Sequence, residues 1–341
     1  MTITQRDVST WAIGVDVGGT KVAAGFVDAR GEIHQHTRAP MNSHGTAEEG
    51  LAAVTSAIDK LLKLAPDKST AARHIGICAP GPLDPHTGVV LNPPNVPCWR
   101  NYPLAAEIAR RYDGSVKLEN DAKSAGLAEA LWGAGRGYRN VFYTCIGTGI
   151  GAGILFDGRI YHGRTGAADE AGHLTIDYKG PPCGCGKKGC IEAMASGTAI
   201  AKKARARLAE ATGRKSLMLE LAGGKMDAVT SEIVGRAYAA GDLLAGEILL
   251  ETVEVLAVWL GNIVDLLEPD VIIIGGGVAA TLNPFFGKIR EQLPRWSLNK
   301  RCLEIPMIPA RYGEESGIAG GAALCLSVGD ANAIRNSLRG H

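Results

Sequence analysis

Short apolar runs typical of strands alternate along the chain with longer runs that have helical periodicity. Three strand-like runs follow one another in the first 40 residues and predict an antiparallel meander. Helical spacing begins at Thr46, which forms a capping-box pattern with Glu49. Strand-like and helical runs then alternate in the order ARHIGICAP, LAAEIARRY, SVKLEND and DAKSAGLAEALWG. This alternation predicts an α/β fold.

The opening pattern returns at residues 141–161, again as strand, glycine-threonine turn, strand, turn and strand. When Gly147 is aligned with Gly19, Gly153 falls on Gly25, so the two segments are 128 residues apart. A period of that length is too long for a solenoid repeat. We interpret it as an internal duplication, which predicts two related α/β domains that face each other across a cleft.

The composition is that of a soluble globular protein. Of 341 residues, 46% are hydrophobic and 21% are charged, enough for two domains with sizeable cores. The formal net charge of +1 provides no overall field that would attract nucleic acid or an anionic membrane. The first residues lack a signal-peptide pattern, and charges interrupt the longest apolar stretch before it reaches the roughly 20 residues of a membrane span. We therefore expect a cytoplasmic protein with a small-molecule partner, without nucleic acid or membrane.

Three glycine-rich turns, DVGGTK, GTGIG and GGGV, each follow an apolar strand. Glycine lets backbone N–H groups approach an anion closely, and the threonine and lysine side chains add donors, so the turns predict phosphate binding. The alternative is that they are tight turns in a compact sheet. The sequence has no G-x-x-x-x-G-K-[ST] motif, and its two lax G-x-G-x-x-A matches lack the context of a dinucleotide site. This excludes a P-loop enzyme and disfavours a dehydrogenase.

Two acidic positions at strand ends suggest phosphoryl-transfer chemistry. Asp16 ends the first strand directly before GGTK, where a carboxylate could reach nucleotide phosphates through Mg²⁺ or could only cap the turn. Asn120 and Asp121 end the run SVKLEND before a helix, and the pair could simply cap that helix. The pair also offers an amide that can orient a hydroxyl and a carboxylate that can accept its proton, as phosphoryl transfer requires.

Three of the eight cysteines, Cys183, Cys185 and Cys190, lie within the segment PPCGCGKKGCIE. Zinc prefers four nitrogen or sulfur ligands in a tetrahedral site, so this segment provides three and leaves one to come from elsewhere. His162 and His173 are the nearest histidines upstream. Redox-active thiols and inert cysteines are the alternatives, although the single residue between Cys183 and Cys185 is awkward for a mutual disulfide.

Together these motifs resemble the ROK family of sugar kinases and repressors, within the actin-like ATPase superfamily. The resemblance covers about residues 11–326, and its most specific parts are the long glycine signature and the CxCGxxGCxE motif. The matching segments are DVGGTK, PGPLD, END, GTGIGAGI, GHLTID, CGCGKKGCIE and GGGV. The resemblance implies a duplicated actin-like ATPase (ribonuclease H-like) fold, with two domains around a cleft. We expect a small α/β domain of residues 1–120 with a C-terminal helix from 315–341, and a large α/β domain of residues 121–314 that carries the zinc site.

The resemblance also implies a role for each motif. ATP and Mg²⁺ would be held by Asp16, Gly18, Gly19, Thr20, Lys21, Gly147, Thr148, Gly149 and Gly151, with Gly275, Gly276 and Gly277 near the adenosine. Asp121 would be the catalytic base that takes a proton from the sugar hydroxyl, and the sugar would be contacted by Gly81, Asn120, Asp121, Glu170, His173 and Glu192. The family pattern selects His173 as the ligand that completes a structural zinc site with Cys183, Cys185 and Cys190.

Two departures from the family pattern stand in GAADEAGH. Asp169 occupies a position where a small residue is more usual, and Ala171 replaces a larger aliphatic residue. The Glu-x-x-His pair of Glu170 and His173 stays intact, so the departures would affect sugar preference or loop packing.

The leading hypothesis is an ATP-dependent hexokinase, above all a glucokinase that makes glucose 6-phosphate. The run PGPLDPHTGVVLNPPNVPCWRNYPL is similar to the corresponding segment of bacterial ROK glucokinases. N-acetylmannosamine, fructose and other hexoses remain alternatives, because a few polar groups set sugar specificity. A sugar-responsive repressor would carry a helix-turn-helix domain before WAIGVDVGGT, where this sequence has about ten residues. A zinc-ribbon nucleic-acid binder is disfavoured by a basic cluster of only two lysines, and a homodimer is expected from the family.

Overall fold

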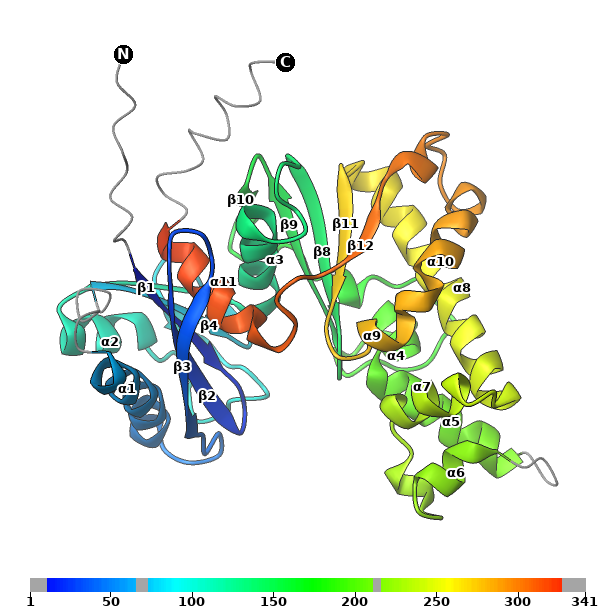
Figure 1. Ribbon diagram of the computed structural model, residues 1–341, viewed down its shortest axis with the longest axis horizontal. Coiled ribbons are helices and arrows are strands. Elements are labelled where there is room, and N and C mark those ends of the chain that lie inside the picture. Colours follow the sequence, from blue (N-terminus) through cyan, green and yellow to red (C-terminus); the bar gives the residue numbers. More distant parts are fainter. Residues whose placement is uncertain (1–10, 66–72, 211–215, 327–341) are drawn as a thin grey trace. The chain divides into compact units, whose positions relative to one another are not determined.

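The computed structural model describes residues 11–65, 73–210 and 216–326 (Figure 1). These residues form two compact units. The first unit contains the N-terminal part up to Val141, the segment Gly153–Asp169 and the C-terminal part from Glu314, and the second contains Phe142–Ala152 and Glu170–Gly313. From the sequence, the domain boundaries were instead expected after residue 120 and at residue 315. Parts of those domains, residues 1–10, 66–72, 211–215 and 327–341, lie outside the described residues.

The first unit is built on a mixed five-stranded sheet with the order β3-β2-β1-β4-β7. β1, β2 and β3 form the predicted antiparallel meander, whereas β4 is parallel to β1 and β7 is parallel to β4. A two-stranded ribbon, β5 and β6, follows β4. The strands are β1 Ala12–Val17, β2 Lys21–Val27, β3 Ile33–Pro40, β4 His74–Ala79, β5 Leu83–Asp84, β6 Val89–Val90 and β7 Ser115–Asn120.

Helices cover both faces of this sheet. On one face, α1 (Ala47–Leu64) packs on β2 and β3, and α2 (Leu104–Tyr112) packs near β7. The predicted capping box of α1 is present, since Glu49 N–H donates to the Thr46 side chain. On the other face, α11 (Ser316–Leu326) packs on β1 and β4 and against α3 (Asp121–Trp132). This packing on α11 places α3 in the first unit rather than in the large domain.

The contact between α11 and the sheet is exceptionally close. A Cβ atom added to Gly14 in β1 would lie 1.8 Å from the carbonyl oxygen of Ile318, and one added to Gly76 in β4 would lie 1.7 Å from that of Gly321. The opposite pleat of β1 carries Ile13 and the main hydrophobic core, because successive side chains of a strand point to opposite faces. Glycine at positions 14 and 76 therefore sets how near α11 can lie.

A second five-stranded sheet repeats this strand order. It has the order β10-β9-β8-β11-β12, which matches β3-β2-β1-β4-β7 strand for strand and agrees with the predicted duplication. β8 and β9 each have residues in both units. The start of β8, the end of β9 and all of β10 belong to the first unit. The strands are β8 Asn140–Ile146, β9 Ile150–Phe156, β10 Arg159–Ile160, β11 Val271–Gly275 and β12 Met307–Pro309.

Most of the second unit is helical. The 25-residue helix α8 is buried along much of its length and packs on α4, α5, α7 and α10. Among the described residues, none of the helices is both long and apolar enough to cross a membrane. The helices are α4 Ile191–Ala195, α5 Gly197–Glu210, α6 Leu217–Leu221, α7 Ser231–Ala239, α8 Leu243–Leu267, α9 Ala279–Leu282 and α10 Phe286–Gln292, with short 3₁₀ turns that include η2 Ala171–His173.

Candidate functional site

The predicted site residues fall into two groups, one in each unit. In the first unit the parallel strands β1, β4 and β7 end at the same edge of the sheet. The glycine turn after β1, Gly81 after β4 and Asn120–Asp121 after β7 are therefore brought together, although they are far apart in the sequence. Ligands of open α/β sheets bind outside this carboxyl edge.

The turn between β1 and β2 is fixed by its backbone and leaves polar side chains exposed. The N–H of Gly18 donates to the carbonyl oxygen of Lys21 at 2.9 Å, and the N–H of Met41 donates to that of Thr20 at 2.9 Å. Thr20 and Lys21 are exposed, whereas Gly18 and Gly19 are half-buried. A hydroxyl and an ammonium group held on a rigid turn are suitable donors for phosphate oxygens.

Asp16 lies at the end of β1, below this turn. Burial, with a smaller effect of the neighbouring Asp121 carboxylate, raises the pKa of Asp16 to about 6, against the opposing effect of Lys21. A buried carboxylate whose pKa is raised by a neighbouring carboxylate is a place where a cation is favourable. The geometry is therefore consistent with a metal-associated carboxylate at Asp16 beside Asp121.

Asn120 and Asp121 form the N-terminus of α3. The side-chain oxygen of Asn120 accepts from the N–H of Ala122 at 3.0 Å and of Lys123 at 3.3 Å, so the helix-capping interpretation is realised. The cap engages only the oxygen of the Asn120 amide, and a Cβ atom at Gly81 would lie 3.6 Å from its nitrogen. Asp121 is exposed at the start of an otherwise buried helix. Capping fixes the pair without preventing it from contacting a hydroxyl.

In the second unit, two predicted glycine turns meet. The N–H of Gly197 donates to the carbonyl oxygen of Gly147 at 2.8 Å, and the N–H of Val278 donates to that of Ile146 at 2.9 Å. The turn Gly147–Gly149 between β8 and β9 thus lies next to the turn Gly275–Gly277 that follows β11. Gly151 lies further along, within β9. The structure brings the GTG and GGG segments together, as one nucleotide site would require.

Glu192 connects the β8–β9 turn to the cysteine segment. Its Oε2 atom accepts from the N–H of Ile150 at 3.0 Å, and its Oε1 atom lies 3.8 Å from Nδ1 of His173. A Cβ atom added to Gly149 would lie 2.5 Å from Oε2, so glycine leaves room for this carboxylate. Glu170 is exposed at the start of η2, which is anchored where Trp259 Nε1 donates to the Ala171 carbonyl oxygen at 3.1 Å.

His173 and the three cysteines of the segment form one compact cluster. The ligand atoms of His173, Cys183, Cys185 and Cys190 all lie within 4.8 Å of one another. Nδ1 of His173 is 3.6 Å from Sγ of Cys183, and the Sγ atoms of Cys185 and Cys190 are 3.7 Å apart. The cysteines are free thiols.

This donor set fits a tetrahedral metal ion. With Zn–S bonds of about 2.3 Å and Zn–N bonds of about 2.0 Å, tetrahedral ligand atoms lie roughly 3.5–3.8 Å apart. The two separations of 3.6 and 3.7 Å fall within that range. Burial raises the pKa of the Cys190 thiol, and a bound cation would offset this by favouring the thiolate.

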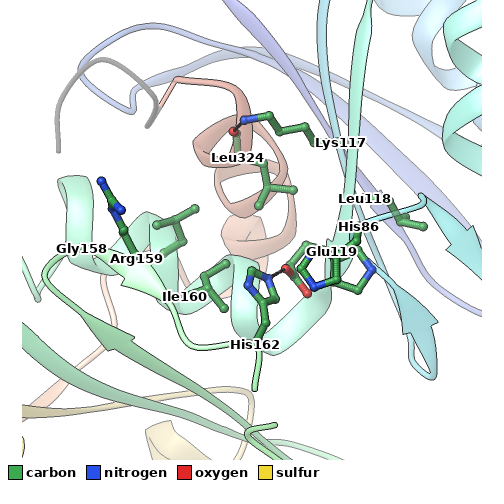
Figure 2. A pocket seen from close by; sticks show the side chains of 11 residues that line it. His86, Lys117, Leu118, Glu119, Gly158, Arg159, Ile160, His162 and Leu324 are labelled. Carbon is green, nitrogen blue, oxygen red and sulfur yellow. Dashed lines mark hydrogen bonds and ion pairs between the residues drawn. The ribbon is translucent and has the colours of Figure 1, made fainter. Parts of the chain in front are cut away.

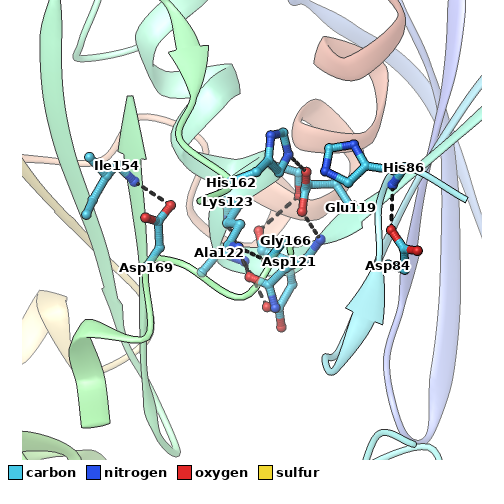
Figure 3. A network of polar contacts seen from close by, with 12 residues as sticks. Asp84, His86, Glu119, Asp121, Ala122, Lys123, Ile154, His162, Gly166 and Asp169 are labelled. Carbon is cyan, nitrogen blue, oxygen red and sulfur yellow. Dashed lines mark hydrogen bonds and ion pairs between the residues drawn. The ribbon is translucent and has the colours of Figure 1, made fainter. Parts of the chain in front are cut away.

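A group of polar residues beside Asn120 was not singled out by the sequence. The first unit has a cavity of about 460 Å³ whose walls include His86, Lys117, Arg159 and His162 (Figure 2). Next to it, the Glu119 carboxylate accepts from the N–H of Asn120 and contacts His162 (Figure 3). Glu119 stood in the END motif without an assigned role, and nothing in the sequence links it to His162, 43 residues away.

The fold is that of the actin-like ATPases, and comparisons with known proteins define the class more narrowly. The sequence pattern of the ROK family matches residues 12–328. This chain belongs to the ROK family.

Several relatives are similar along nearly their whole length. The glucokinase of Thermotoga maritima is 33% identical over 313 residues, which are 92% of this chain and 96% of the relative. The glucokinase of Halalkalibacterium halodurans is 34% identical, over 92% of this chain and 94% of the relative. The N-acetyl-D-glucosamine kinase of Mannheimia succiniciproducens is 30% identical, over 92% of this chain and 99% of the relative.

Solved structures show the same likeness. The ROK family glucokinase from Streptomyces griseus, in complex with glucose and AMPPNP, superposes with a TM-score of 0.79 at 31% identity and covers 93% of this chain and 100% of its own. The ROK hexokinase from Thermus thermophilus superposes with a TM-score of 0.77 at 30% identity and covers 94% of this chain and 100% of its own.

Proposed function

We propose that this ROK sugar kinase transfers the γ-phosphoryl group of ATP to the 6-hydroxyl of a hexose, with glucose as its preferred acceptor. Two glucokinases are 33% and 34% identical to the chain along nearly its whole length, and the similar S. griseus structure holds glucose and AMPPNP. The N-acetyl-D-glucosamine kinase at 30% identity identifies the main competing acceptor. The observation that carries the proposal is the exposed Asp121 carboxylate, fixed beside Asp16 at the carboxyl edge of the sheet.

In this proposal Asp121 accepts the proton of the sugar hydroxyl as its oxygen attacks the γ-phosphorus in line. Asn120 orients that hydroxyl with the amide nitrogen that the helix cap does not engage. Phosphoryl transfer needs mainly positioning and charge neutralisation, so one base and two rigid anion-binding turns are sufficient. Gly81, Glu170, His173 and Glu192 are the remaining proposed sugar contacts.

The phosphates of ATP would be held by donors on the two glycine-threonine turns. In the first unit these are the exposed side chains of Thr20 and Lys21, on the turn that Gly18 and Gly19 form. In the second unit, Gly147, Thr148, Gly149 and Gly151 would serve the phosphates, and Gly275, Gly276 and Gly277 the adenosine. Mg²⁺, when bound with ATP, neutralises phosphate charge, and Asp16 is the carboxylate proposed to face it.

The proposal also assigns a structural zinc ion to His173, Cys183, Cys185 and Cys190. Four nitrogen and sulfur donors close a tetrahedral site and leave no position for a reacting water. The ion would act by fixing the chain around Glu170, His173 and Glu192 rather than by taking part in the reaction.

The decisive experiment is a coupled assay with ATP over a panel of sugars: glucose, N-acetylglucosamine, N-acetylmannosamine, mannose and fructose. We expect the highest kcat/KM with glucose. If another sugar gave the highest kcat/KM, the kinase activity would stand and that sugar would replace glucose as the proposed substrate. Turnover of none of the sugars would refute the proposed activity.

Replacement of Asp121 by asparagine should lower kcat by about 10²- to 10⁴-fold, because the proton acceptor is lost. The KM for sugar should change much less, since asparagine keeps a hydrogen-bonding side chain at the helix start. Asp113→Asn is the matched control, because Asp113 ends α2 in a left-handed conformation that asparagine also adopts. Near-normal turnover of Asp121→Asn would remove Asp121 from the role of base.

A further inference from the structure

Glu119 is a buried carboxylate directly before the proposed catalytic pair. It lies in β7, and its side chain is only 3% exposed. Its Oε1 atom accepts from the N–H of Asn120 at 2.8 Å, and its Oε2 atom lies 2.5 Å from Nε2 of His162. With the ring proton of His162 on Nε2, this nitrogen donates to the carboxylate oxygen. Figure 3 shows both contacts on one carboxyl group.

This arrangement fixes the peptide that precedes Asn120. A buried carboxylate without donors is costly, and the two donors compensate that cost only while the geometry is kept. The Asn120 backbone is therefore held where its side-chain oxygen can cap α3. The direction of the Asn120 amide and of the next side chain, Asp121, follows from that backbone.

The loop that supplies His162 holds α3 at a second point. Lys123, in the first turn of the helix and 4% exposed, donates through Nζ to the carbonyl oxygen of Gly166 at 2.7 Å. Residues 161–169, which we call the brace loop, thus contact β7 before the Asn120–Asp121 pair and α3 after it. The end of the loop is itself fixed, since Asp169 Oδ2 accepts from the N–H of Ile154 at 3.0 Å. All of these contacts lie within the first unit.

We propose that His162, Glu119 and Lys123 are positioning residues, through which the brace loop sets the orientation of Asn120 and Asp121 for transfer to the sugar. This rests on the proposed kinase function. Misplacement of a reacting group by about 1 Å can cost roughly 100-fold in rate. Loss of a brace contact should therefore act on kcat and leave ATP binding nearly unchanged.

The surroundings of His162 make it the best position to test. One side of its ring forms part of the wall of the 460 Å³ cavity, where His86 lies with its ring centroid 5.5 Å away (Figure 2). Side chains of other shapes can be accommodated beside an open space. His162→Gln keeps an N–H donor for Glu119, whereas His162→Leu removes it.

We expect kcat to fall roughly 10- to 100-fold in His162→Leu and to stay within about threefold of wild type in His162→Gln. The KM for ATP should stay within about twofold in both, because the glycine turns are untouched. The control is His34→Leu, which removes the donor of another His–carboxylate pair in the same unit, His34 Nε2 to Asp28 Oδ2 at 2.9 Å. Asp28 likewise accepts from backbone N–H groups, but it lies in the turn after β2.

A folded His162→Leu enzyme with kcat within threefold of wild type would overturn the inference, as would an equal loss in His162→Gln. Lys123→Met tests the second contact in the same assay, should His162→Leu not fold. A kcat for Lys123→Met within twofold of wild type would also overturn the inference. A wild-type enzyme inactive on every sugar would instead refute the proposed function, so the two failures are distinguishable.

Discussion

At the scale of single residues, Asp169 combines several unfavourable features. Its backbone is left-handed, with φ of 72°. Its Oδ1 atom is buried without a hydrogen-bond partner among the described residues, whereas Oδ2 accepts from Ile154. Burial, partly opposed by the Ile154 N–H and by the charges of Lys123 and His162, raises the pKa of Asp169 to about 6, and Glu119 contributes to the rise. The ionised form of Asp169 is therefore held at a cost to stability.

This cost depends on pH. The folded protein holds the Asp169 proton more tightly than the unfolded chain, where the pKa is near 3.8. The free energy of unfolding therefore falls as pH rises from about 4 to about 6, and the loss is complete above that range. Asp169→Asn removes the charge and keeps an oxygen for the Ile154 N–H. We expect it to raise the free energy of unfolding at pH 8 by about 1–3 kcal/mol and to change it little at pH 4, in urea titrations at both pH values.

The control is Asp157→Asn, at another left-handed aspartate whose side chain is 65% exposed and paired with Arg139. Its effect should be small and similar at both pH values. An Asp169→Asn protein that is equally stabilised at pH 4 and pH 8 would show that backbone strain, rather than charge, dominates.

At the scale of elements, the close contact of α11 with β1 and β4 lets us predict how a larger residue at position 14 changes stability. Gly14→Ala would place a methyl group against the Ile318 carbonyl, within a packing that leaves no room. Overpacking of this kind should lower the free energy of unfolding by about 1–3 kcal/mol or more, measured by urea denaturation. Gly287→Ala is the control, because the added Cβ of this α10 glycine meets only open space. It should leave stability unchanged or raise it by up to about 1 kcal/mol, and equal losses in both variants would contradict the packing argument.

The cysteine segment and the following helix α4 carry a second prediction at the scale of elements, which concerns the proposed zinc ion. Removal of the metal should release His173 and, through it, Glu192, whose Oε1 atom lies 3.8 Å from the histidine. We expect glucose affinity, measured by calorimetry, to weaken about tenfold or more on chelation, as for lost supports of a metal site. ATP affinity should weaken less, because the β8–β9 turn is also held by backbone contacts outside the cluster, such as the hydrogen bond from Gly197 N–H to the Gly147 carbonyl oxygen.

Cys185→Ser should reproduce the effect of chelation, whereas Cys98→Ser should not, because Cys98 lies outside the cluster. Metal analysis of the purified protein should find about one zinc ion per chain. Absence of zinc, or unchanged glucose affinity after its removal, would count against the structural site.

At the scale of the whole molecule, the sequence could predict features that depend on residues close together in the chain. The alternation of strand-like and helical runs predicted the α/β fold. The strand–turn–strand pattern around Gly19 and Gly147 predicted the duplication, with which the matching strand orders of the two sheets agree. The cysteine spacing, with the family pattern, predicted a cluster that the structure assembles. The three cysteines and each glycine turn lie within a few positions, so spacing is sufficient to find them, whereas His173 as the fourth ligand came from the family pattern.

Contacts between distant parts of the chain could not be predicted in this way. The assignment of α3 to the first unit depends on packing against α11, which begins almost 200 residues later. The His162–Glu119 contact joins residues 43 positions apart, and no sequence motif links the two. Such contacts arise from register and packing, which no local pattern records.

The position of α11 in the sequence has a consequence for folding during synthesis on the ribosome. The strip of β1 and β4 around Gly14 and Gly76 is covered by α11, which is made long after both strands. At about 5–20 residues per second, roughly 12–50 s separate the synthesis of β4 from that of α11 on the ribosome. Throughout that interval the strip around Gly14 and Gly76 lacks its α11 contact, so the first unit, although begun first, completes its packing only after most of the second has been made.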